Sequence, residues 1–315
     1  MSGQMLRVTE IEALTPLVTR FRFEHPEGAA LPLFSGGAHV VVEMPDAGVL
    51  RRNAYSLISD PMDGSGYEIA VRREEGGRGG SKFMHGKVAV GDLMRISAPV
   101  NLFSLDLRAR KHVMIAGGIG ITPFLAQLKQ LARLQQPFEL HYAARSRAEA
   151  AGLALLPDSP QVHVHLSEEG NRMDLGAILG KQPLGTHVYT CGPEGLIAAV
   201  AETGARLGWP KAALHSEVFM APPPGAPFEV TLAKTGKTVT VGPHQSLLEA
   251  LEQAEVEVQW MCRGGACGRC ETGVHACDGT IEHHDHWLSD EERQSQTKIM
   301  PCVSRFKGET LVLDL

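Results

Sequence analysis

Four cysteines near the carboxyl end are the residues with the clearest chemistry. Cys262, Cys267 and Cys270 lie in one segment, and Cys302 follows far downstream. Three thiols at Cys-x4-Cys-x2-Cys spacing with a distant fourth are typical of a [2Fe–2S] site, which predicts one-electron transfer. The glycines of this segment can adopt positive φ and bring backbone N–H groups close to the sulfurs. The alternative is a structural zinc site, although zinc modules usually pair two short Cys-x2-Cys segments.

Two glycine turns each follow a predicted buried strand and open a predicted helix. Residues 116–123 read AGGIGITP, and residues 190–194 read TCGPE. Such turns present free N–H groups and the positive end of a helix to a phosphate. The first turn alone is equally compatible with a tight structural turn, because it departs from the G-x-G-x-x-G pattern. A second turn at the same sheet edge favours a nucleotide site.

Two stretches in the first third of the chain combine arginine, serine and glycine. Residues 51–57 read RRNAYSL, and residues 70–81 read AVRREEGGRGGS. The glycines and Ser81 precede a predicted helix at 82–87, which indicates another helix start suited to an anion, with arginines close by. An edge strand with a charged end and a mobile glycine loop are the alternatives.

The elements that must position these groups follow three patterns. Short strand candidates at 6–14, 17–24, 39–44, 52–58, 67–72 and 93–96 predict an antiparallel β-barrel over residues 1–107. Strands at 111–116, 138–143, 162–166 and 187–191 alternate with helices at 123–134 and 193–207. They predict an α/β parallel-sheet domain over residues 108–220, with ligands at the strands' carboxyl ends.

The last part of the chain predicts a separate α+β domain. Prolines stiffen a linker at residues 221–227. A hairpin at 228–232 and 238–241, a helix capped by Ser246 and a strand at 310–315 then predict a domain over residues 228–315.

Composition limits the classes of function. A chain of 315 residues suits two or three domains. The longest apolar stretch, 112–126, is too short to span a bilayer, and the first residues lack the regions of a signal peptide; both predict a cytoplasmic location. Residues 226–315 carry 14 Asp and Glu against 8 Lys and Arg, so the net charge of −6 lies there. This balance argues against nucleic-acid binding and suits either docking to a basic partner or solubility.

Taken in order, the four motifs resemble the class IA reductases of Rieske-type oxygenase systems. This phthalate dioxygenase reductase-like family includes the reductases of vanillate demethylase and carnitine monooxygenase, and the resemblance covers all 315 residues. It implies an FMN-binding barrel, an NAD-binding domain and a β-grasp plant-type ferredoxin domain. It also implies a monomeric, NADH-dependent reductase that passes electrons one at a time to a separate Rieske-type mono- or dioxygenase.

The resemblance further implies individual site residues. Ser56, Thr122, Cys191 and Phe219 would surround the reacting nicotinamide and flavin rings. Cys262, Cys267, Cys270 and Cys302 would hold the cluster. The residues implied to bind the flavin are Arg52, Asn53, Tyr55, Ser56, Arg72, Gly79, Gly80 and Ser81, and those for the dinucleotide are Gly117, Gly118, Gly120, Thr122, Arg145, Cys191, Gly192, Pro193 and Phe219.

The chain departs from the family pattern at one position. The family has Arg-x-Tyr-Ser, whereas Asn53 stands two residues before Tyr55 and Arg52 lies one residue earlier. The choice of FMN over FAD therefore rests on domain order. Arg145, in the ARSR segment 144–147, could mark a 2′-phosphate, but the family's similar Arg-Ser is compatible with NADH, which we favour over NADPH.

A flavin is required because a hydride delivers two electrons and the cluster accepts one. Alternatives are a reductase for a cytochrome P450 or another acceptor, and a stand-alone diaphorase or ferric reductase. A nucleotide-responsive binding protein with a zinc-stabilised tail is the alternative from a different class. His163 and His165, on an alternating strand, are interpreted as structural, and residues 283–287 as a solvated loop.

Overall fold

The structure is a computed structural model that describes residues 3–46, 48–219 and 224–315. The predicted linker at 221–227 lies partly outside these residues. The chain divides into two compact units. One comprises residues 1–40, 55–73 and 88–219, and the other comprises residues 41–54, 74–87 and 220–315.

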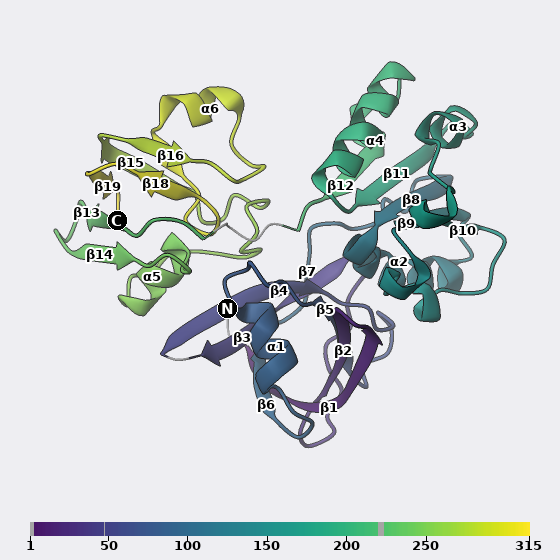
Figure 1. Cartoon of the computed structure of the whole chain (residues 1–315), viewed down its shortest axis with the longest axis horizontal. Coiled ribbons are helices and arrows are strands. Elements are labelled where there is room, and N and C mark those ends of the chain that lie inside the picture. The colour runs from purple at the N-terminus through teal and green to yellow at the C-terminus, as the bar shows by residue number, and fades with distance from the viewer. Residues whose placement is uncertain (1–2, 47, 220–223) are drawn as a thin grey trace. The chain divides into compact units, whose positions relative to one another are not determined.

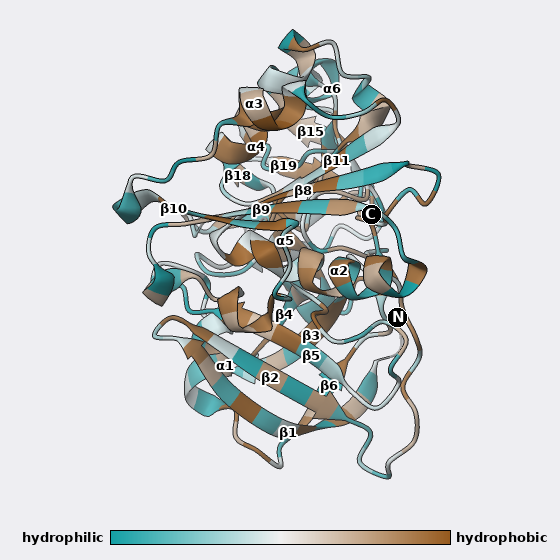
Figure 2. Cartoon of the chain, turned by 90° about the vertical axis from the view of Figure 1, so that its right-hand side faces the viewer, coloured by the Kyte–Doolittle hydropathy of each residue, from teal (hydrophilic) through white to brown (hydrophobic). Residues whose placement is uncertain are grey.

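The first third of the chain forms the predicted antiparallel sheet (Figure 1). Its strand order is β4-β3-β6-β1-β2-β5, with β7 paired to β3. Alternate side chains along β2, such as Phe21 and Phe23, are fully buried, and Figure 2 shows the resulting apolar and polar bands along β1 and β2. The elements are β1 (Gln4–Thr15), β2 (Val18–Glu24), β3 (Ala38–Asp46), β4 (Val49–Ser56), β5 (Tyr67–Arg72), α1 (Gly80–Lys87), β6 (Leu93–Ile96) and β7 (Val100–Asn101).

The middle of the chain forms a parallel sheet in the order β10-β9-β8-β11-β12. Apolar residues of β8 fill both faces, since Met114 and Ala116 pack in one core and Val113 and Ile115 in another. The strands are β8 (Lys111–Gly117), β9 (Phe138–Ala144), β10 (Val162–Leu166), β11 (Thr186–Cys191) and β12 (Leu214–Glu217). The helices are α2 (Thr122–Leu134), α3 (Leu175–Gly180) and α4 (Glu194–Arg206), with 3₁₀ turns at Gly118–Ile121, Arg147–Glu149, Leu153–Leu155, Ser167–Glu169 and Lys211–Ala213.

The carboxyl-terminal segment has a mixed sheet in the order β14-β13-β19-β15-β17, and β16 pairs with β18. Ser246 caps α5 as predicted, because its hydroxyl accepts the Glu249 N–H while the Glu249 carboxylate accepts the Ser246 N–H. The elements are β13 (Phe228–Leu232), β14 (Thr238–Val241), α5 (Leu247–Gln253), β15 (Thr272–Cys277), β16 (Thr280–Glu282), α6 (Asp290–Ser295), β17 (Lys298–Ile299), β18 (Arg305–Lys307) and β19 (Leu311–Leu313).

The predicted fold class is confirmed, and most predicted elements agree with the structure to within a few residues at each end. The short elements α3, α6, β7, β12 and β15 to β18 were not predicted, because too few of their residues repeat to show a period. The interpretation of residues 283–287 as a solvated loop is wrong at its centre. Asp285 is buried, and its carboxylate accepts the Trp287 and Leu288 N–H groups. No helix within the described ranges is long and apolar enough to cross a membrane.

Candidate functional site

The four predicted cluster ligands form two thiol pairs. The thiols of Cys262 and Cys267 interact with each other, and so do those of Cys270 and Cys302. The Cys267 thiol lowers the pKa of Cys262 to about 5, helped by N–H groups of Gly264, Ala266 and Cys267, while the pKa of Cys267 itself is raised. In the same way the pKa of Cys270 is lowered and that of Cys302 is raised. Two pairs of thiols, each able to hold one iron, fit a [2Fe–2S] cluster.

A single-ion site fits these cysteines less well. Within the described ranges, the one group of three metal-ligating side chains that converge within 4.8 Å contains no cysteine. The loop itself is tightly confined. Gly268 has φ +71°, and a Cβ there would lie 2.2 Å from the Trp287 ring, so only glycine fits. The backbone of the cysteine loop is therefore fixed at Gly268.

The two glycine turns of the parallel sheet contact each other directly. A Cβ on Gly120 would lie 2.3 Å from the carbonyl oxygen of Cys191, and one on Gly117 would lie 2.8 Å from Cδ of Pro193. A side chain on Gly117 or Gly120 is therefore excluded where the turns after β8 and β11 meet. The open backbone of both turns lies at the carboxyl ends of adjacent parallel strands, where this class of sheet binds nucleotides.

Cys191 ends β11 opposite Glu217, which ends β12. Burial raises the pKa of Glu217 to about 8, and its Oε2 atom is buried without a hydrogen-bond partner. Burial and the neighbouring carboxyl together raise the pKa of Cys191. Both groups are consequently protonated near neutral pH, so this end of the sheet presents no negative charge. Sequence reasoning missed Glu217, although it stands two residues before Phe219, whose ring is 45 % exposed.

One buried cluster links the segment that follows Ser56 to the two glycine turns. Ile58, Ile121 and Cys191 belong to this cluster. The Lys129 ammonium on α2 also donates to the carbonyl oxygen of Ile58 at 2.8 Å. Within this compact unit the structure therefore brings together the segments of Ser56, Thr122 and Cys191, three of the four predicted reaction-site residues.

The predicted phosphate-binding turn lies in the other unit. Gly79 has φ +106°, and α1 begins at Gly80. A Cβ on Gly80 would lie 2.3 Å from Nδ2 of Asn53, so the Asn53 amide rests directly on the start of α1. Ser81 closes the turn, since its hydroxyl accepts the Glu74 N–H at 3.0 Å. A helix start with an amide donor beside it fits a flavin phosphate.

Arg52 contacts carboxylates in this structure. Its guanidinium donates to Glu43 and to Glu252, each at 2.8 Å. The nearby Arg78 donates to the buried Glu249 at 2.5 Å. Glu249 and Glu252 lie on α5, and sequence reasoning did not connect them with these arginines. Of the other predicted residues, Arg72 is exposed at the end of β5 and Tyr55 is half-buried on β4.

Comparisons with known proteins agree along the whole chain. Residues 5–105 match the family described as an oxidoreductase FAD-binding domain. Residues 96–214 match the dimethylamine monooxygenase subunit DmmA-like N-terminal domain, and residues 230–307 match the 2Fe-2S iron-sulfur cluster binding domain.

Curated relatives are similar over nearly their full length. The beta subunit of heme-dependent oxidative N-demethylase from Ectopseudomonas mendocina is 46 % identical, with 98 % of each chain covered. The carnitine monooxygenase reductase subunit of Escherichia coli is 45 % identical, again with 98 % of each covered. The solved structure of phthalate dioxygenase reductase superposes with a TM-score of 0.90 at 35 % identity, covering 99 % of this chain and 98 % of that one.

The chain is a member of the phthalate dioxygenase reductase family. The resemblance stated from the motifs is thereby confirmed, as are the oxidoreductase class, the flavin-binding barrel and the [2Fe–2S] domain. The relative from Escherichia coli is named as the reductase subunit of a monooxygenase. The roles assigned to individual residues remain predictions.

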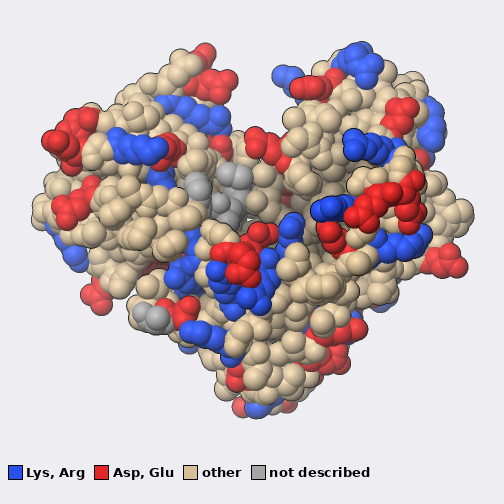
Figure 3. Space-filling model, viewed as in Figure 1, with Lys and Arg blue, Asp and Glu red and all other residues tan. Residues whose placement is uncertain are grey.

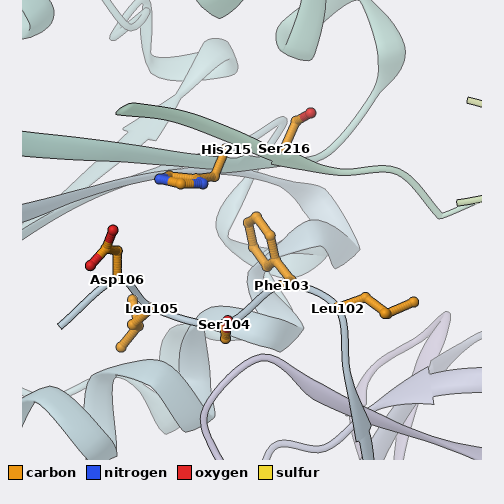
Figure 4. A pocket seen from close by; sticks show the side chains of 7 residues that line it. All are labelled: Leu102, Phe103, Ser104, Leu105, Asp106, His215 and Ser216. Atoms are coloured by element: carbon orange, nitrogen blue, oxygen red, sulfur yellow. The ribbon is translucent and has the colours of Figure 1, made fainter. Parts of the chain in front are cut away.

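One cavity of this family member lies outside the predicted site residues. It has a volume of about 380 Å³ and is lined by Leu102, Phe103, Ser104, Leu105, Asp106, His215 and Ser216. Figure 4 shows the Phe103 ring directed toward the strand that carries His215 and Ser216. The Tyr189 hydroxyl accepts the Asp106 N–H at 2.7 Å, and its ring stacks on His215. These contacts hold the loop after the barrel against β11 and β12.

Charges of both signs are interspersed over the face of this reductase shown in Figure 3. Many of them pair within the chain, as Arg133 does with Asp60 and Lys298 with Glu292. Exposed pairs of this kind contribute little stability.

Proposed function

We propose that this chain carries electrons from NADH, through FMN and a [2Fe–2S] cluster, one at a time to a separate oxygenase. The observation that carries the proposal is the arrangement of Cys262, Cys267, Cys270 and Cys302 in two thiol pairs. They follow a flavin barrel and a parallel-sheet domain in the same chain. When bound, a flavin accepts the two electrons of a hydride together and releases them singly, as the cluster requires.

The chain's own residues would position a bound nicotinamide against a bound flavin. The turns at Gly117–Gly120 and Cys191–Pro193 pack on each other, and a Cβ on Gly118 would meet nothing within 4 Å, so a dinucleotide would approach the backbone at Gly118. The protonated thiol of Cys191 and the protonated carboxyl of Glu217 keep the nicotinamide end of the site uncharged. Phe219, partly exposed beyond β12, would cover a bound flavin and exclude water from it.

FMN is the flavin that we assign. The start of α1 at Gly80, with the Asn53 amide resting on it, offers N–H donors to a terminal phosphate. Asn53 thus takes the place of the family's arginine, since Arg52 pairs with Glu43 and Glu252. Acid extraction and mass spectrometry of the released flavin test this assignment, and release of FAD would refute it.

NADH is the electron donor that we assign. Arg145 follows β9 at the sheet's carboxyl edge and pairs with Glu168 at 3.2 Å, and Arg147 pairs with Glu169 at 3.5 Å. Their positive charge is thus partly offset, which disfavours a dianionic 2′-phosphate. We expect kcat/KM for NADH to exceed that for NADPH at least tenfold. Equal values, or a preference for NADPH, would refute the assignment.

A Rieske-type oxygenase is the partner that the motifs imply. A heme-dependent oxygenase is the second candidate, and it is favoured by the 46 % identity to a heme-dependent oxidative N-demethylase subunit. The related subunits are named for oxidation of dimethylamine and carnitine, so an amine-containing substrate fits either partner. We infer a cytoplasmic location, a monomeric chain and the domain boundaries given above as part of the same proposal.

The decisive experiment follows the two cofactors separately. Anaerobic addition of NADH to the flavin- and cluster-loaded protein should bleach the flavin absorbance first and then the [2Fe–2S] absorbance at longer wavelengths. Addition of a purified Rieske or heme oxygenase should restore the cluster absorbance only if that oxygenase is the true partner. A protein that carries zinc and no flavin would show no visible absorbance, which would end the proposal.

A further inference from the structure

A group of histidines and one glutamate lies on the parallel sheet, outside the site described above. Glu139 and His141 are on β9, and His163 is on the neighbouring edge strand β10. In the parallel register His163 lies directly opposite His141. Because side chains alternate along a strand, all three are on the same face of the sheet. One ligand atom from each lies within 4.8 Å of the others, and no other such group occurs in the described part of the chain.

The three side chains converge at a point that solvent can reach. Oε1 of Glu139 lies 2.8 Å from Nε2 of His141 and 4.0 Å from Nε2 of His163. The rings of His141 and His163 are stacked with centroids 4.8 Å apart. Glu139 and His141 are buried, whereas the His163 side chain is 44 % exposed. The group therefore has a fixed inner side and an open outer side.

The hydrogen bonds around His141 leave room for either a second proton on its ring or a cation beside it. The Asn171 amide donates from Nδ2 to the carbonyl oxygen of Val164, so its Oδ1 accepts from Nδ1 of His165. Nε2 of His165 then carries a lone pair and accepts from Nδ1 of His141 at 3.1 Å. A neutral imidazole has one N–H. If His141 is neutral, its Nε2 then carries a lone pair and faces Oε1 of Glu139 at 2.8 Å.

The glutamate is held in place from behind. Its other oxygen, Oε2, accepts from the Lys111 ammonium at 2.6 Å and from the Gln182 amide at 3.1 Å. Oε1 is thus left to face the two histidines. Metal-bound histidines and carboxylates are usually oriented by such outer hydrogen bonds. Here both His141 and Glu139 have them before any ion is added.

We propose that Glu139 Oε1, His141 Nε2 and His163 Nε2 bind a divalent zinc ion. Two imidazoles and one carboxylate are a known zinc ligand set that leaves a fourth position for water. Imidazole donors favour zinc and its neighbours over magnesium and calcium, which prefer oxygen. The ion would lie between the two facing acceptors and would link the edge strand β10 to β9. None of the three residues is among those predicted to bind the flavin, the nucleotide or the [2Fe–2S] cluster.

Zinc binding to the flavin- and cluster-loaded protein tests the proposal. After treatment with a chelator that leaves the iron in place, we expect one zinc per chain by calorimetry. Zinc-edge anomalous scattering in a crystal should place the ion between Glu139 and His163. His163→Asn should weaken binding at least tenfold, and Glu139→Gln should do the same.

The chain offers a matched control on the opposite edge of the same sheet. His187 and His215 also stack, at 5.2 Å, but belong to no such three-ligand group among the described residues. His187→Asn should leave zinc binding unchanged, and zinc should raise the Tm of this variant and of the wild type but not of His163→Asn. Equal zinc affinity in the wild type and His163→Asn would overturn the proposal. So would absence of zinc from the wild type, since a doubly protonated His141 would then satisfy Glu139.

Discussion

Nη1 of Arg52 donates to Oε2 of Glu252 at 2.8 Å and joins strand β4 to helix α5 across 200 residues of sequence. The same carboxylate accepts two bonds from Arg263, at 2.8 and 2.7 Å. Arg263 follows Cys262 in the loop that carries Cys262, Cys267 and Cys270, and its side chain is only 3 % exposed. Glu252 therefore connects the strand that carries Asn53 and Tyr55 to the loop that carries the first cluster cysteine.

Replacing Glu252 tests this connection. Glu252→Gln would leave the guanidinium of Arg263 buried and without its carboxylate, which costs about 3 kcal/mol of unfolding free energy. We also expect slower electron transfer from flavin to cluster, measured by stopped-flow absorbance. Glu291→Gln, at an exposed position of α6, is the control and should change stability by less than about 0.5 kcal/mol. Equal effects of the two substitutions would show that Glu252 is an ordinary surface residue.

Removal of one cluster thiol should separate the two halves of the electron path. Cys302→Ser should lose the iron and the [2Fe–2S] absorbance, because Cys270 would be left without its paired thiol. Reduction of ferricyanide by NADH should continue, because the flavin receives the hydride. Cys277→Ser is the matched control, since Cys277 lies on β15 outside both thiol pairs. An unchanged iron content in Cys302→Ser would contradict the ligand assignment.

Because the two glycine turns are in contact, we expect alanine to be far more disruptive at Gly120 than at Gly195. Gly120→Ala places a Cβ 2.3 Å from the Cys191 carbonyl oxygen, so the turns must separate. We expect a loss of about 2 kcal/mol in stability and at least a tenfold fall in kcat/KM for NADH. A Cβ on Gly195, in α4, meets open space. Gly195→Ala should therefore stabilise the protein by about 0.5 kcal/mol and leave kcat/KM unchanged. Measured kinetics that are alike in the two variants would refute the contact.

Burial of Glu217 predicts how stability depends on pH. Its pKa rises from 4.5 to about 8 in the folded protein. Between these values the folded chain holds one more proton than the unfolded chain, so the free energy of unfolding falls as pH rises from 5 to 8. The pH-dependent contribution of Glu217 to the free energy of unfolding is on the order of 4 kcal/mol. This contribution should vanish in Glu217→Gln, which urea denaturation at pH 5 and pH 8 can measure. Parallel pH dependences in the wild type and the variant would mean that Glu217 does not titrate this way.

Features that depend on neighbours in sequence were predictable from the sequence. Cys262, Cys267 and Cys270 share one loop, and Ser246 caps the helix that begins at Leu247. Both features depend only on residues that are close in sequence. The glycine turns were also predictable, since a buried strand, a turn and an apolar helix follow one another directly. Local spacing thus determined the cluster, the nucleotide turns and the order of the domains.

Only the tertiary structure decided which distant groups meet. The pairing of Cys270 with Cys302, the orphan carboxyl of Glu217 beside Cys191 and the link from Arg52 to Glu252 join segments far apart in sequence. His163 was interpreted as structural because its strand alternates, and only the register with β9 places it opposite His141 beside Glu139. Strand order and register are set by the burial of whole faces. No short stretch of sequence contains that information, so these partners become visible only when the chain is folded.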